Sequence, residues 1–164
     1  MPASASHTAP KNHFGDLEGL LSELAAVGYR RYGAALASAM NEAGIDPRAR
    51  MREMGRAYVG FARQHPGMFL LMFRGERLDM NRPALSESIE DTRRALREAT
   101  AAVASAIALP PLQLAARATA SWALAHGFAM LLIDGRLRNT LASIPKTSVD
   151  MLLDAVLDAL RPND

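Results

Sequence analysis

The sequence contains no cysteine, and this absence excludes several kinds of protein. Disulfide frameworks and thiolate metal sites both require cysteine, so neither is available to this chain. The four histidines are scattered without the spacing of metal ligands, and we therefore expect no metal and no cofactor. A chain without disulfides suits a reducing compartment, which favours a cytoplasmic protein.

Strong charge and long apolar runs are also missing. The net charge of +2 is too small to indicate nucleic-acid binding by itself. The uncharged run at residues 118–133 is shorter than the ~20 residues of a membrane-spanning helix, and a histidine interrupts it. No basic segment followed by an apolar run opens the chain, so we expect no secretory signal and no membrane partner.

The motifs of common enzyme classes are absent too. The sequence has no Gly-x-Ser-x-Gly, no glycine-rich phosphate loop and no His-Glu-x-x-His. Ser121 and His126 lie five residues apart, so on a helix they point in different directions and make a poor nucleophile–base pair. We therefore expect no catalytic residues and no enzymatic activity.

Residues that favour helices dominate instead. Alanine, leucine and arginine are abundant, β-branched residues are few, and 164 residues suit one domain with a hydrophobic core. The chain shows no strand pattern and no internal repeat. We therefore predict an all-α protein in which a handful of helices pack as one bundle.

Capping residues and prolines divide the predicted helices. Asp16 is a suitable N-cap for the first helix, which should end at Gly44. Thr147 or Ser148 can cap the last helix. The boundaries predicted between them are Pro47, His65–Pro66, Pro83, Pro110–Pro111 and a loop at 139–146, and Pro162 ends the last helix.

Charged side chains recur in the second and the last predicted helix. The arginines spread around much of the second helix, so we interpret them as a solvated face rather than a nucleic-acid patch. An acidic row at four-residue spacing runs along the last helix. The arginines are Arg48, Arg50, Arg52, Arg56 and Arg63, and the acidic row is Asp150, Asp154 and Asp158.

The central helix, at residues 118–133, is largely apolar on two opposite faces. Such a helix is buried all round, but a short chain can cover only one face with its own core. A second copy of the same helix is the simplest partner for the other face, so we predict a symmetric homodimer. The predicted interface combines this face with the apolar side of the last helix: Ala120, Leu124, Gly127, Leu131, Met151, Leu152, Ala155 and Val156.

The other face of the central helix carries Trp122 and His126, which lie four residues apart. A stripe of methionine and aromatic side chains at residues 51–73 is expected to oppose it. Both sets could form an ordinary core, in which the histidine hydrogen-bonds a carbonyl. They could also line an apolar ligand pocket, for which methionine is adaptable. The residue pattern alone favours the core.

Three stretches are informative through their order and spacing. Trp122 is followed by His126-Gly127, and residues 58–73 read Tyr-Val-Gly-Phe-Ala-Arg-Gln-His-Pro-Gly-Met-Phe-Leu-Leu-Met-Phe. Residues 6–21 read Ser-His-Thr-Ala-Pro-Lys-Asn-His-Phe-Gly-Asp-Leu-Glu-Gly-Leu-Leu. These stretches resemble TetR-family transcriptional regulators: the Trp-xxx-His-Gly signature of the WHG-type C-terminal domain, its Tyr…Phe-Ala…His-Pro…Met-Phe segment, and a recognition helix running into the fourth helix.

The resemblance implies a TetR-like repressor that senses a small, mostly apolar inducer, forms a homodimer and binds operator DNA. Residues 1–15 would be the remnant of a helix-turn-helix DNA-binding domain, and residues 16–164 the C-terminal ligand-binding and dimerisation domain. The DNA-binding part is expected to be truncated, because two helices precede the recognition helix in this family. The alternative is a dimeric helical module that senses a ligand or a partner and does not bind DNA.

The resemblance also implies positions for the two sites. The DNA contacts would be Ser6, His7, Thr8, Lys11, Asn12 and His13. The inducer would contact Met54, Tyr58, Phe61, Met72, Trp122, His126 and Met130.

Overall fold

The computed structural model describes residues 16–107 and 110–159, and every regular element in these ranges is helical. The predicted all-α class is therefore confirmed. The helices are α2 (Leu17–Glu42), α3 (Pro47–Gln64), α4 (Pro66–Met72), α5 (Pro83–Ile107), α6 (Pro111–Ile133), α7 (Arg138–Ser143) and α8 (Val149–Ala159), with a 3₁₀ turn, η1 (Gly75–Arg77), before α5.

The ends of the helices follow local chemistry. Asp16 Oδ1 accepts a hydrogen bond from the Gly19 N–H at 2.8 Å and caps α2. Gly44, just after α2, has a φ of +78°, which glycine adopts without a steric penalty. Ser148 Oγ accepts from the Met151 N–H at 3.1 Å and caps α8. Proline is the first residue of α3, α4, α5 and α6, where its missing N–H costs no helical hydrogen bond.

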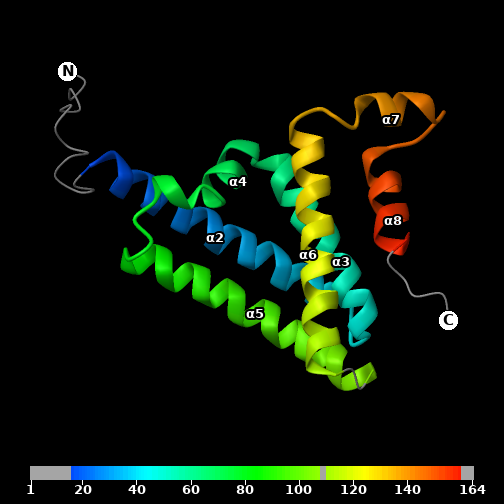
Figure 1. The fold of residues 1–164 in the computed structure, drawn as a ribbon, viewed down its shortest axis with the longest axis horizontal. Helices are drawn as coiled ribbons and strands as arrows, with labels where there is room; N and C mark the ends of the chain where they lie inside the picture. The colour runs from blue at the N-terminus through cyan, green and yellow to red at the C-terminus, as the bar shows by residue number, and fades with distance from the viewer. Residues whose placement is uncertain (1–15, 108–109, 160–164) are drawn as a thin grey trace.

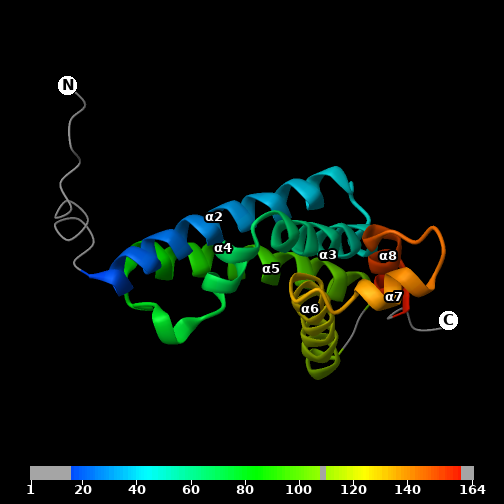
Figure 2. The ribbon, with the colours of Figure 1, turned by 90° about the horizontal axis from the view of Figure 1, so that it is seen from above.

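The helices form a layer with one helix running across it. α2 and α5 lie side by side along the long axis, and α6 crosses them in projection (Figure 1). α3 packs on both α2 and α6, and α8 contacts α3. Figure 2 shows α6 projecting from the layer that α2, α3 and α5 form. The N-terminal half of α6 is therefore mostly exposed within one chain, although its sequence is apolar.

The hydrophobic core has two parts. The larger one surrounds α3 and contains the completely buried Phe69 of α4 together with Tyr58 and Ala129 from α3 and α6. The smaller one lies between α2 and α5 and is centred on Leu85 and Ala26. The larger core gathers aromatic side chains from three helices, so it positions the candidate site.

Two sequence predictions differ from the structure. Residues 139–146 were expected to form a loop, but α7 occupies 138–143. Six residues are too short to show helical periodicity in a sequence, and α7 has no side-chain hydrogen bond at its N-cap.

The arginines of α3 are not simply a solvated face. Arg56 Nε donates to Asp154 Oδ1 at 2.6 Å, and Arg63 donates to Asp150 at 3.0 Å. Arg52 pairs with Asp158 and lies within 3.7 Å of Asp154. The acidic row of α8 therefore meets three arginines of α3. The two rows are about 100 residues apart in sequence, so their pairing is a consequence of helix packing.

Candidate functional site

The strongest cluster of polar and aromatic groups forms where α3, α4 and α6 meet. Phe69 and Phe73 are four residues apart around the end of α4, and their ring centroids lie 4.9 Å from each other. Tyr58 of α3 packs edge-on against Phe69 at 5.5 Å. His126 of α6 completes the group, with its ring 4.8 Å from Phe73 and 5.6 Å from Phe69. Three helices thus place four rings around one point.

A single hydrogen bond joins the polar members of this cluster. The Tyr58 hydroxyl lies 2.8 Å from Nδ1 of His126. Burial raises the pKa of Tyr58, although the neighbouring Trp122 side chain acts in the opposite direction. Burial lowers the pKa of His126 below its ordinary value of 6.5. At neutral pH both groups are therefore uncharged, and in the imidazole tautomer with its proton on Nε2 the phenol donates to Nδ1. The hydrogen-bond partner of the histidine is thus a phenol, whereas the core interpretation expected a carbonyl.

This arrangement leaves one donor of His126 unused. When Nδ1 accepts from Tyr58, the imidazole proton resides on Nε2. Nε2 makes no hydrogen bond with residues 16–107 or 110–159. Trp122 lies beside it, with ring centroids 6.0 Å apart, and its side chain is 54% exposed. The site can therefore offer an N–H donor next to an open indole face.

The structure gives the predicted ligand residues different degrees of burial and does not bring all of them together. Met54, Tyr58, Phe61 and Met72 are buried, His126 and Met130 are half-buried, and Trp122 is exposed. Phe61 lies on a different side of the core, where its ring meets Tyr32 and His65. Burial of the methionines fits core packing, whereas the Tyr58–His126–Trp122 group reaches the surface. The predicted pocket therefore remains a prediction, with these three residues at its accessible end.

A second feature of α6 is an apolar groove on its opposite side, which we call the α6–α8 groove. It has a volume of about 390 Å³ and is bounded by α6, α7 and α8. Five of the predicted interface residues line it. The other three, Ala120 of α6 and Met151 and Ala155 of α8, are exposed. The five are Leu124, Gly127, Leu131, Leu152 and Val156.

The sequence interpretation missed part of this groove. Leu137 and Thr140 also line it and belong to the segment around α7 that was expected to be a loop. Thr140 is the only lining side chain with a polar atom. Leu131 and Met151 keep 42% and 58% of their surface exposed, so the groove and its rim form one apolar surface within a single chain.

Other predictions concern DNA contacts, metal binding and membrane association. The DNA contacts Ser6, His7, Thr8, Lys11, Asn12 and His13 fall outside the described residues. Within the described ranges no group of three or more His, Cys, Asp or Glu side chains is arranged to hold a metal ion. No helix in that part of the chain is long and apolar enough to cross a membrane.

Comparisons with known proteins identify related chains. The family profile described as "Tetracyclin repressor-like, C-terminal domain" matches residues 51–158. No curated protein matches the sequence. A solved structure titled "Structure of a protein with unknown function from Rhodococcus sp. RHA1" is 32% identical and superposes with a TM-score of 0.72. That match covers 96% of this chain and 77% of the other.

Proposed function

The chain belongs to the family of tetracycline repressor-like C-terminal domains, and from this premise we propose that it is the sensing and dimerisation part of a TetR-like repressor. Domains of this family are regulatory rather than catalytic, and in general they dimerise and bind small ligands. One observation carries the proposal: α6 presents Trp122 and His126 to Tyr58 of α3 on one side and borders the α6–α8 groove on the other.

This arrangement suggests how a ligand acts at a distance. A small, mostly apolar molecule with one hydrogen-bond acceptor would bind beside Trp122 and accept from Nε2 of His126. Ligand contacts that differ between two positions of α6 would shift the population of those positions. Because the same helix borders the groove, the shift would change the geometry of the dimer and hence the affinity for operator DNA.

The homodimer is tested by placing a charge in the groove. Leu131→Arg should convert a dimer into a monomer, because an arginine at an apolar seam has no partner and its burial is costly. The measurement is light scattering after size-exclusion chromatography. Leu112→Arg is the matched control, because Leu112 lies on the same helix, is 81% exposed and does not line the groove. A monomeric wild-type chain at micromolar concentration would refute the dimer.

Ligand sensing is tested with a panel of small apolar compounds. Trp122 is the only tryptophan, so a change in tryptophan fluorescence reports on this position alone. A true ligand should change that fluorescence and raise the melting temperature. At a free ligand concentration one hundred times the dissociation constant, binding adds about 2.7 kcal/mol to the free energy of unfolding. His126→Phe should weaken binding of the same compounds because it removes the Nε2 donor. If no compound produces both signals, or if His126→Phe binds them all as well as wild type, the proposed site is wrong.

A further inference from the structure

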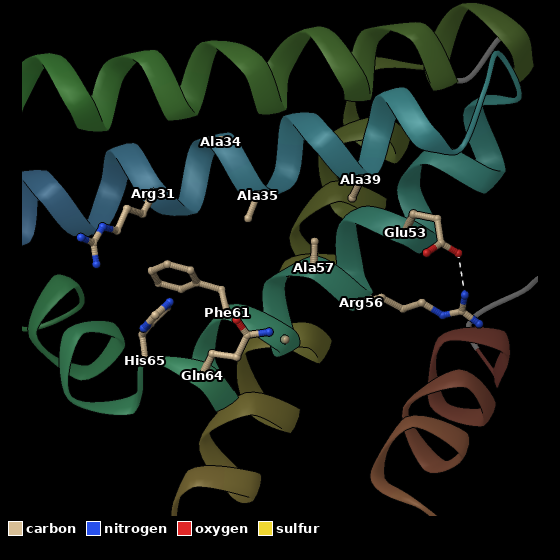
Figure 3. Close-up of a pocket in the computed structure, with 11 residues that line it drawn as sticks. Arg31, Ala34, Ala35, Ala39, Glu53, Arg56, Ala57, Phe61, Gln64 and His65 are labelled. Carbon is tan, nitrogen blue, oxygen red and sulfur yellow. Dashed lines mark hydrogen bonds and ion pairs between the residues drawn. The ribbon is translucent and has the colours of Figure 1, made fainter.

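A larger groove lies on a different part of the molecule, between α2 and α3, and we call it the α2–α3 groove. Its volume is about 690 Å³, within the ~300–1,000 Å³ range of small-molecule sites. It is open along one side and ends at the α3–α4 junction (Figure 3). None of its lining residues borders the α6–α8 groove, and neither Tyr58, Trp122 nor His126 lines it.

The walls of this groove are made of small side chains. Ala35 and Ala39 of α2 face Ala57 of α3 across it, and Gly60 of α3 also lines it. A Cβ atom placed on Gly60 would have no neighbouring atom within 4 Å, so the space above this residue is empty. These small side chains in the middle of the groove leave a channel in which a flat or slender molecule can lie against both helices.

The charges of the groove are distributed unevenly between its two ends. At one end Arg56 is neutralised, because it pairs with Glu53 at 2.7 Å and with Asp154 at 2.6 Å. At the other end Arg31 makes no hydrogen bond or ion pair with any described residue. Glu53 is the only acidic residue in the lining, and it belongs to the neutralised end. Among the described residues, the one positive charge of the lining without a partner is therefore that of Arg31.

Two further polar side chains gather near Arg31. Gln64 and His65 end α3, and their side chains make no hydrogen bond within the described ranges. Pro66 begins α4 and forces the chain to break at His65, whose side chain caps neither helix. The imidazole instead packs against the Phe61 ring at 5.0 Å. Figure 3 shows the Phe61 and His65 rings at the same end of the groove as Arg31, with the Gln64 side chain directed toward the middle of the groove.

We propose that the α2–α3 groove binds an amphipathic monoanion, a slender apolar molecule that carries one carboxylate or comparable anionic group. The anion pairs with Arg31, whose guanidinium suits a planar carboxylate, and accepts further hydrogen bonds from Gln64 or His65. The apolar body lies over Phe61 and along the alanine walls. The Glu53–Arg56 pair closes the far end and disfavours a second anionic group there.

This inference is independent of the proposed repressor function. It concerns a separate surface and a ligand with a charge, whereas the site beside Trp122 offers a single neutral donor. Loss of one site should leave binding at the other intact. The two proposals can therefore fail separately.

The probe for the test is anilinonaphthalene sulfonate, a fluorescent amphipathic monoanion. Phenylnaphthylamine has the same ring system without the sulfonate and serves as its neutral counterpart. Both dyes are titrated into the intact chain, and the fluorescence gives a dissociation constant for each. The proposal requires the wild-type chain to bind the anionic dye more tightly than the neutral one.

Three variants assign the dye to the groove. Arg31→Gln should weaken binding of the anionic dye about tenfold, the effect of one lost charge-assisted hydrogen bond. Binding of the neutral dye should not change. Arg30→Gln removes the adjacent exposed arginine, which does not line the groove, and should alter neither dye. Gly60→Leu fills the empty space and should weaken both dyes without unfolding the chain, as its melting temperature checks.

Three results would overturn the proposal. Equal losses in Arg31→Gln and Arg30→Gln would mean that the dye responds only to overall charge. Unchanged binding in a folded Gly60→Leu variant would place the dye outside the groove. If the Leu131→Arg variant no longer binds the anionic dye while the Gly60→Leu variant binds it as well as wild type, the dye lies in the α6–α8 groove.

Discussion

Phe69→Ala should lower the free energy of unfolding by about 3–5 kcal/mol, the cost typical of removing a buried phenyl group. Phe69 is completely buried, and its ring packs against Tyr58, Phe73 and His126. Its removal takes away apolar surface and leaves a cavity at the point where α3, α4 and α6 meet. Because the lost ring also supports Tyr58 and His126, the change should loosen the hydrogen bond between them.

Urea denaturation monitored by circular dichroism measures this loss. Leu112→Ala is the control, because Leu112 is 81% exposed and its truncation should change stability by no more than about 0.5 kcal/mol. An effect of Phe69→Ala as small as that of the control would contradict the packing described for the α3–α4–α6 junction.

Gly28→Val should be destabilising by about 2 kcal/mol, even though valine favours a helix more than glycine does. A Cβ at Gly28 would lie 2.7 Å from Sδ of Met72 and 2.9 Å from Cγ of both Met72 and Met68. Met72 is almost completely buried, so its side chain cannot move outward to make room. The added atoms would instead push α2 away from α4. Because α4 carries Phe69, this movement would disturb the core.

Gly60→Val is the matched control for this effect. Gly60 also lies inside a helix, but nothing lies within 4 Å of an added Cβ. Its replacement should therefore be neutral or slightly stabilising, because glycine is the poorer helix former. Thermal and urea denaturation of both variants give the comparison. If Gly28→Val is as stable as Gly60→Val, then α2 and α4 do not approach each other as closely as described.

The ends of most helices were predictable because they depend on neighbouring residues. Asp16 caps α2 through a residue three positions away, and Pro66 ends α3 through a clash with the residue before it. The same local logic failed for α7, which is a six-residue helix without side-chain capping. Its existence depends on surrounding packing, and that packing also makes Leu137 part of the α6–α8 groove.

The candidate site was predictable in its members but not in its contacts. The sequence pattern named Tyr58, Trp122 and His126, because periodicity shows which side chains share a helix face. It could not show that Tyr58 and His126 share a hydrogen bond, since the two residues are 68 positions apart and meet only through the packing of α3 on α6. It also could not distinguish the buried Met54 from the exposed Trp122.

By itself the sequence determined the helical class, the helix ends that rest on caps and prolines, and the two apolar faces of α6. These properties arise from backbone geometry and from contacts within a few residues. Only the tertiary structure decided that arginines of α3 pair with the acidic row of α8, and that Arg31 has no partner among residues 16–107 and 110–159 beside an alanine-lined groove. The charge and size of each side chain are local properties. Whether a charge is compensated, or a small residue leaves a space, depends on which helix lies opposite.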